Sequence, residues 1–163
     1  MGRRNYLIEG VSGAGKTSVC DELLRRGERA VQGDRELAYQ GDPATGRPLP
    51  GSSHQHHIWS AERVRWIAAD TSRGRTFFCG GLRNHAALLD VFDGVFVLDV
   101  GEAVLLRRLE GRGDDEYGGT EEQRRHVLRL LQSGEDLPEG VRIDAEQPLR
   151  GVVDELLRLA PPG

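Results

Sequence analysis

The sequence has few of the residues that mark secreted, metal-bound or nucleic-acid-binding proteins. It contains only two cysteines in 163 residues, too few for a disulfide framework or a zinc ribbon. Its formal net charge is -4, so no basic surface for nucleic acid is expected. The apolar run near the N-terminus, Tyr6-Leu7-Ile8, is too short for a signal sequence or a membrane span. We therefore expect a cytoplasmic protein with no nucleic-acid or membrane partner.

The length and composition fit one globular domain over residues 1–163. The chain is 37% hydrophobic, enough to form a real core at this size. No internal repeat or linker interrupts it. We expect a monomer or a homodimer.

A glycine-rich loop follows the first apolar run directly. Gly10-Val11-Ser12-Gly13-Ala14-Gly15-Lys16-Thr17 has the full Walker A spacing. Its glycines let backbone N–H groups curl around phosphate oxygens, and a helix that begins near Lys16 points its positive end at them. Lys16 is expected to reach the β and γ phosphates of ATP, and the Thr17 hydroxyl to hold Mg²⁺. The predicted phosphate-binding residues are Gly10, Ser12, Gly13, Ala14, Gly15, Lys16, Thr17 and Ser18.

Strand-like and helix-like segments alternate along the chain. The pattern predicts strands over residues 4–9, 29–32, 76–79, 95–100 and 141–143. It predicts helices over residues 17–26, 59–71, 82–92, 102–110, 120–132 and 149–159. This alternation favours an α/β fold with a five-stranded parallel sheet and helices on both faces. The inward-facing side chains are expected to include Leu24, Trp66, Ala86, Leu88 and Leu89.

The second strand ends in Gly33-Asp34. The carboxyl ends of parallel strands meet at one edge of a sheet, so Asp34 is expected near the phosphates. A carboxylate there can accept a proton from an attacking hydroxyl or orient it. The alternative is that Asp34 is the N-cap of a short helix at Glu36.

Residues 37–58 have no periodicity and are rich in Gly, Pro, Ser and His. We expect a mobile acceptor-binding loop here, with one helical turn near residues 36–39 and with its histidines and Trp59 lining a pocket. The run His54-Gln55-His56-His57 also suggests a metal site. Against that alternative, no matching cluster of ligands occurs elsewhere in the sequence.

These motifs together resemble the small P-loop kinases that phosphorylate nucleosides, nucleotides and hydroxylated metabolites, such as adenylate kinase and shikimate kinase. Asp99-Val100 and Arg108-Leu109-Glu110-Gly111-Arg112 are similar to the adenylate kinase segment that leads into its lid. The resemblance implies a three-layer P-loop NTPase fold with a short lid at residues 111–119. It also implies that Arg108 stacks on adenine and that Arg112 contacts the transferring phosphoryl group. The alternative for both arginines is a solvated helix surface.

A second similarity lies at Asp144-Ala145-Glu146-Gln147-Pro148, which resembles the adenine-contacting loop of these kinases. It implies that Ala145 and Gln147 bind the nucleotide. Arg125 resembles an arginine of the helix after the lid.

The third strand departs from the nucleotide monophosphate kinases, because Phe78-Cys79-Gly80-Gly81 has no aspartate. Shikimate kinase has glycines at this place, and its pattern after the second strand resembles Gly33-Asp34. The acceptor side therefore resembles that of a hydroxyl kinase. The residues expected to bind the acceptor are Asp34, Arg35, His57, Gly80, Gly81 and Arg83. Thr17 and Asp34 are expected at the metal. A shikimate carboxylate would need an arginine, for which Arg63, Arg65 and Arg83 are candidates.

The sequence thus predicts an ATP- and Mg²⁺-dependent kinase that transfers the γ-phosphoryl group to a hydroxyl of a nucleoside or of a shikimate-like or polyol-like metabolite. Lys16, Asp34 and Arg112 are its predicted catalytic residues. The first alternative is a regulatory ATP- or GTP-binding protein or an ATPase, although the sequence has no Asn-Lys-x-Asp guanine motif. The second is a nucleotide-dependent binding protein without turnover.

Overall fold

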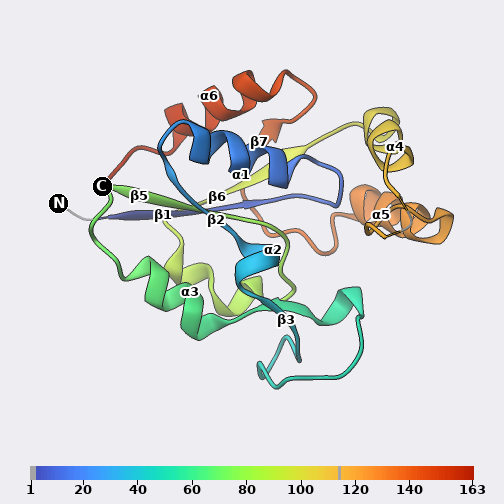
Figure 1. Cartoon of the computed structure of the whole chain (residues 1–163), viewed down its shortest axis with the longest axis horizontal. Helices are drawn as coiled ribbons and strands as arrows, with labels where there is room; N and C mark the ends of the chain where they lie inside the picture. Colours follow the sequence, from blue (N-terminus) through green and yellow to red (C-terminus); the bar gives the residue numbers. More distant parts are fainter. Residues whose placement is uncertain (1–2, 114) are drawn as a thin grey trace.

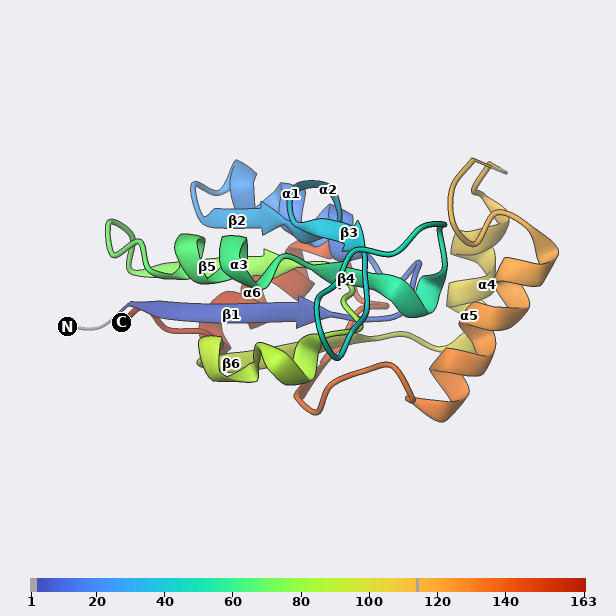
Figure 2. The same ribbon diagram turned by 90° about the horizontal axis from the view of Figure 1, so that it is seen from below.

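The computed structural model describes residues 3–113 and 115–163. It confirms the predicted five-stranded parallel sheet, whose strand order is β2-β5-β1-β6-β7. Figure 2 shows β2, β5 and β1 side by side. The strands are β1 (Arg4–Glu9), β2 (Arg29–Gln32), β5 (Arg75–Cys79), β6 (Gly94–Asp99) and β7 (Val141–Asp144).

Helices cover both faces of the sheet, as predicted (Figure 1). Helices α1 (Lys16–Arg25) and α6 (Leu149–Leu159) lie on one face, and α3 (Ala61–Ala68) lies on the other. Helices α4 (Glu102–Glu110) and α5 (Glu121–Ser133) lie beyond the carboxyl ends of the strands. The sheet edge at which the strands end is therefore enclosed on one side by α4 and α5.

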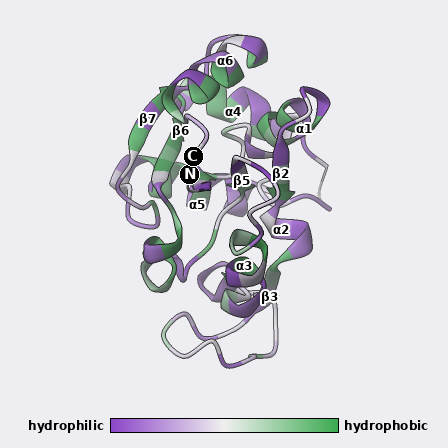
Figure 3. Cartoon of the chain, turned by 90° about the vertical axis from the view of Figure 1, so that its left-hand side faces the viewer, coloured by the Kyte–Doolittle hydropathy of each residue, from purple (hydrophilic) through white to green (hydrophobic). Residues whose placement is uncertain are grey.

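The alternation of side chains along β1 divides the core in two. Tyr6 and Ile8 join a buried cluster with residues of α1, α4, α5 and α6. Leu7, between them, joins a separate cluster with residues of α3. Successive strand residues point to opposite faces, so a strand covered on both sides must be apolar throughout. Colouring by hydropathy shows both kinds of residue along the amphipathic helix α6 (Figure 3).

Residues 37–58 contain more secondary structure than the sequence indicated. They contain β3 (Ala38–Gln40), which pairs antiparallel with β4 (His57–Trp59), and a 3-10 turn, η1 (His54–His56). The expected helical turn is shifted, because α2 spans Gly33–Glu36 and the chain is already extended at Ala38. With only three residues in each of the two strands, the hairpin is too short to give a periodic signal.

The helix predicted over residues 82–92 is wrong. The segment forms two 3-10 turns, η2 (His85–Ala87) and η3 (Leu89–Val91). Leu88 is buried, but Ala86 and Leu89 are exposed. The Asn84 side chain holds both the N–H and the carbonyl of Trp59, at 3.1 and 2.9 Å. This tertiary contact fixes a tight turn where local pattern favoured a helix.

Several predicted core positions also differ. Leu24 is 47% exposed and Trp66 is 72% exposed. Trp66 lies on α3, whose buried residues are instead Val64, Ile67 and Ala68. No helix among the described residues is both long and apolar enough to cross a membrane.

Candidate active site

The Walker A segment forms the floor of a cleft of about 580 Å³ at the carboxyl end of β1. Gly13 and Gly15 have positive φ angles of 90° and 109°, which other residues adopt only with strain. These two turns bring the loop around to α1, which begins at Lys16. The lining includes the predicted nucleotide residues Ser12, Gly13, Ala14, Gly15, Lys16, Thr17, Ser18, Arg108, Arg112, Ala145 and Gln147.

Arg108 connects the Walker A loop to the predicted adenine loop. Its Nη1 donates to the carbonyls of Ala14 and Gly13, at 3.1 and 3.4 Å. Its Nη2 donates to the carbonyl of Ala145 at 2.8 Å. The guanidinium thus lies between the two segments that the resemblance assigned to one nucleotide.

Arg112 reaches the Walker A loop from the predicted lid, residues 111–119. Its Nη1 donates to Ser12 Oγ at 2.8 Å and also to the carbonyl of Tyr117. Residue 114, inside the predicted lid, lies outside the described residues. Arg112 therefore contacts the loop that is predicted to bind the phosphates.

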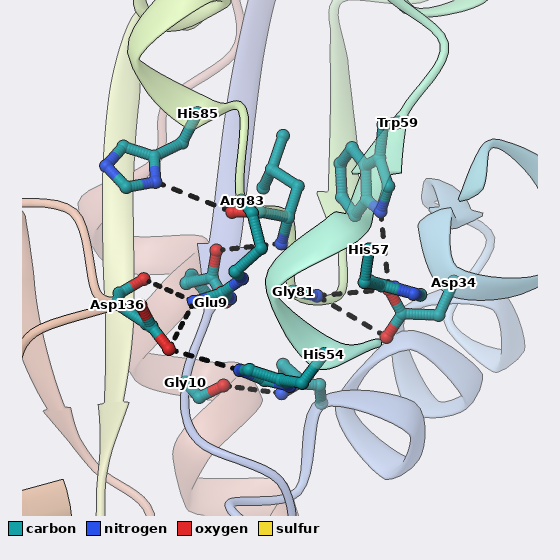
Figure 4. Close-up of polar contacts among 12 residues, drawn as sticks. Glu9, Gly10, Asp34, His54, His57, Trp59, Gly81, Arg83, His85 and Asp136 are labelled. Carbon is teal, nitrogen blue, oxygen red and sulfur yellow. Dashed lines mark hydrogen bonds and ion pairs between the residues drawn. The ribbon is translucent and has the colours of Figure 1, made fainter. Parts of the chain in front are cut away.

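The Asp34 carboxylate lines the same cleft as Lys16. Figure 4 shows Asp34 next to His57 and Gly81. Asp34 Oδ1 is 2.9 Å from His57 Nε2 and accepts from Trp59 Nε1 at 3.3 Å. The N–H of Gly81 donates to both carboxylate oxygens, at 3.1 and 3.4 Å. Burial would raise the pKa of Asp34, but the His57 contact and the charge of Lys16 outweigh it and lower the pKa. Asp34 is therefore a fixed, ionised acceptor of hydrogen bonds.

The capping alternative for Asp34 is wrong. The N-cap of α2 is Gln32, and no side chain caps this helix. Trp59 does not line a pocket either, because it is completely buried. A Cβ atom on Gly33 would lie only 2.1 Å from its ring, and one on Gly80 only 2.7 Å away. The indole thus fills the space between two glycines and positions Asp34 with its N–H.

A second cavity, of about 390 Å³, lies beside the first. The predicted acceptor residues Asp34, His57, Gly81 and Arg83 line it. Gly80 lies within contact distance of Asp34, while Arg35 is exposed on α2 and is not among the lining side chains. Of the other arginine candidates, Arg63 and Arg65 are exposed on α3 and also lie outside the lining. His54 also lines this cavity, as expected for the histidines of residues 37–58, whereas the sequence pattern did not identify Tyr117, Val127, Leu130, Asp136 and Leu137 as part of the site.

Comparison with known proteins agrees with this geometry. The model of a family described as "AAA domain" matches residues 7–129. The chain belongs to the AAA domain family. No curated protein matches the sequence significantly.

Solved structures show that this AAA domain has the fold of the small P-loop kinases. A gluconokinase from Sinorhizobium meliloti 1021 is 22% identical, with a TM-score of 0.57, and the match covers 96% of this chain and 93% of the other. A shikimate kinase from Bacteroides thetaiotaomicron is 14% identical, with a TM-score of 0.63 and coverages of 96% and 97%. A deoxyadenosine kinase from M. mycoides with bound dATP is 13% identical, with a TM-score of 0.56 and coverages of 96% and 98%.

Glu9 is a further site residue of this AAA domain that the sequence analysis missed. It ends β1, and its side chain is fully buried. Its Oε2 accepts from the N–H of Leu82 at 3.3 Å, and its Oε1 is 3.7 Å from Arg83 Nη2 (Figure 4). Burial raises the pKa of Glu9 to about 7, although Lys16 and Arg83 oppose the shift. A charged residue directly after the apolar run Tyr6-Leu7-Ile8 was the available signal.

The oxygen donors of this AAA domain fit a magnesium ion at the nucleotide cleft. The Thr17 hydroxyl and the Asp34 carboxylate both line the cleft. Mg²⁺ is usually held by one or two protein oxygens together with substrate phosphates and water. Among the described residues, no three His, Cys, Asp or Glu side chains gather closely enough to hold a metal without such help. The histidine run therefore lacks the partners that a zinc site would need there.

Proposed function

We propose that this protein is an ATP-dependent kinase that phosphorylates a hydroxyl group of a small molecule. The observation that carries the proposal is that two cavities meet at one group of residues. Ser12, Lys16 and Asp34 line both the nucleotide cleft and the second cavity. A donor and an acceptor held in these two spaces would face each other across Asp34 and Lys16, and such positioning is the main requirement for phosphoryl transfer.

Each residue has a role in this scheme. Gly13, Gly15 and their neighbours would hold the phosphates through backbone N–H groups, and Lys16 would neutralise charge on the transferring group. Arg112 would add a second cation from the other side. Thr17 and Asp34 would hold Mg²⁺, which supplies charge neutralisation of the phosphate oxygens when it is bound. Asp34 would orient the acceptor hydroxyl and take up its proton.

A regulatory nucleotide-binding protein or an ATPase is the less well supported alternative. Such a protein needs a phosphate site but has no use for a second cavity that opens on the same lysine and carboxylate. Its water nucleophile would also not need the side chains of the β3–β4 hairpin, which reach Asp34 through His57 and Trp59.

The substitution Asp34→Asn tests the proposal. An acceptor is first selected by thermal shift from nucleosides, sugars and cyclitols, in the presence of Mg²⁺ and a non-hydrolysable ATP analogue. Asparagine keeps a hydrogen-bond acceptor for Trp59 but loses the negative charge and most of the basicity. We expect the variant to stay folded, and its acceptor-dependent ADP formation at saturating ATP and Mg²⁺ to fall at least about 100-fold.

Asp90→Asn is the control, because Asp90 is exposed and pairs only with Arg65 on the surface among the described residues. The Asp90→Asn variant should form ADP with the same acceptor at the rate of the parent protein. Near-normal turnover by Asp34→Asn with the same acceptor would contradict the proposed role of this carboxylate.

A further inference from the structure

We propose that the acceptor is an uncharged alcohol with an apolar side, such as a nucleoside or a sugar, and not a carboxylate or a phosphate ester. This inference rests on the proposed kinase function and narrows its substrate class. It follows from the charges that surround the second cavity. We call this cavity, together with the residues that line it, the acceptor cavity.

The arginine that lines the acceptor cavity, Arg83, already contacts carboxylates of the protein itself. Among the described residues, Lys16 and Arg83 are the lysine and the arginine that line it. Arg83 Nη1 donates to the carbonyl of Asp136 at 2.9 Å and lies 3.2 Å from its carboxylate. Its Nη2 lies 3.7 Å from Glu9, and its side chain is only 8% exposed. Turning Arg83 toward a ligand anion would leave the largely buried Asp136 carboxylate without its cation, which is costly.

Lys16 does not replace Arg83 as an anion site. It lies in the Walker A loop, where its charge is needed by the phosphates of the nucleotide. An anionic acceptor would therefore meet two cations that both have other partners.

Carboxylates also surround the acceptor cavity. Asp34 and Asp136 line it, and Glu9 lies directly behind Gly81, where an added Cβ atom would be 3.1 Å from Oε1. Figure 4 shows Glu9, Arg83 and Asp136 in one group, with Asp34 across from them. The charges of Asp34 and Asp136 would repel a ligand carboxylate or phosphate here, a device that proteins use to exclude wrong ligands.

The remaining lining suits a neutral ring compound. Val11, Val127, Leu130 and Leu137 provide an apolar wall, and Gln40, Ser52 and Ser53 provide neutral polar groups on other sides. Ligand sites commonly combine an apolar surface with a few polar groups that fix orientation. A nucleoside or a sugar has both a ring face to pack on such a wall and hydroxyl groups for the polar side.

Matched pairs of probes test the inference by binding. Suitable pairs are adenosine with AMP, thymidine with TMP, glucitol with gluconate, and methyl shikimate with shikimate. Each is titrated by calorimetry into the protein with Mg²⁺ and a non-hydrolysable ATP analogue. We expect at least one neutral member to bind at least about tenfold more tightly than its anionic partner. Equal or tighter binding of the anionic members, or no binding by any neutral member, would overturn the inference.

Asp136→Asn probes the charge argument directly. It removes one carboxylate from Arg83 and should raise the affinity for anionic members relative to neutral ones by about tenfold. Glu135→Gln is the matched control, since Glu135 is exposed and lies outside the acceptor-cavity lining. An unchanged preference in a folded Asp136→Asn variant would contradict the argument. If a neutral probe binds but yields no ADP from ATP, the kinase function fails while the inferred ligand class stands.

Discussion

At the scale of single residues, the ionisation of Glu9 has the largest consequence for stability. Its carboxyl group is fully buried, and its pKa is raised from 4.5 to about 7. The folded protein therefore holds this proton over a pH range in which the unfolded chain has released it. This contribution to the free energy of unfolding is fully present below pH 4.5 and is lost as the pH rises through 7. The total loss is at most about 3 kcal/mol.

Glu9→Gln should remove this pH dependence. The amide keeps the size of the side chain and an oxygen for the Leu82 N–H, but it does not titrate. We expect the free energy of unfolding of the variant, relative to the parent protein, to increase between pH 5 and pH 8. Urea unfolding at several pH values measures the difference. Glu121→Gln, at an exposed position on α5, should show no such trend, and a flat difference for Glu9→Gln would refute the shifted pKa.

Residues with a local signal were placed correctly by the sequence, while residues defined by distant contacts were not. The position of Lys16 was predicted from the Walker A spacing, and that of Asp34 from the end of the second strand. Glu9 and Asp136 are 127 residues apart in the numbering but both contact Arg83. No local sequence pattern indicates that these two residues contact the same arginine, because the contact depends on how β1 and the segment after α5 pack together.

At the scale of elements, the β3–β4 hairpin joins the acceptor side to the predicted lid through an aromatic cluster. His54 of η1 stacks on Tyr117 with ring centroids 5.6 Å apart, and it meets the edge of His126 on α5 at 5.0 Å. Its Nε2 lies 3.1 Å from Asp136 Oδ2. Burial and the charge of Arg83 lower the pKa of His54, although Asp136 opposes them. A neutral imidazole suits such packing.

His54→Ala should loosen the predicted lid. An aromatic pair contributes about 0.5–1.5 kcal/mol beyond its buried area, so its loss should raise the open population about tenfold at most. We expect faster amide hydrogen exchange at residues 115–119, and a higher KM for the acceptor with little change in the KM for ATP. His85→Ala removes an imidazole outside both cavities and should leave exchange unchanged. Identical exchange in both variants would show that the cluster does not hold the segment.

The central elements were predictable because their signals are long and periodic. Strands β1, β5 and β6 contain apolar runs, and the helices on the faces of the sheet carry clear amphipathic patterns. The hairpin and the two 3-10 turns were missed. Their conformation depends on Trp59, whose backbone is held by Asn84 and whose ring packs between Gly33 and Gly80.

At the scale of the whole molecule, the proposed nucleotide site joins segments from both ends of the chain. The Walker A loop follows β1, and Ala145 follows β7. Arg108, on α4, contacts both through their carbonyls. A nucleotide that binds across these segments would stabilise the folded chain, because any ligand that binds only the native state adds to its stability. The gain is about 2.7 kcal/mol when the ligand is present at 100 times its Kd.

Arg108→Ala should reduce this ligand-dependent stability. We expect a non-hydrolysable ATP analogue with Mg²⁺ to raise the melting temperature of the parent protein clearly. If Arg108 covers the base, its loss weakens binding about tenfold or more, which corresponds to about 1.4 kcal/mol of the gain at a fixed ligand concentration. Arg107→Ala is the matched control, since Arg107 is the exposed neighbour on the same helix. The variant without ligand reports the structural part of the role, because the carbonyl contacts of Arg108 exist without nucleotide. One outcome would contradict the predicted stacking of Arg108 on adenine. In that outcome, Arg108→Ala has a lower melting temperature without ligand, but the analogue raises its melting temperature as much as that of the parent protein. Arg108 would then only connect the two loops.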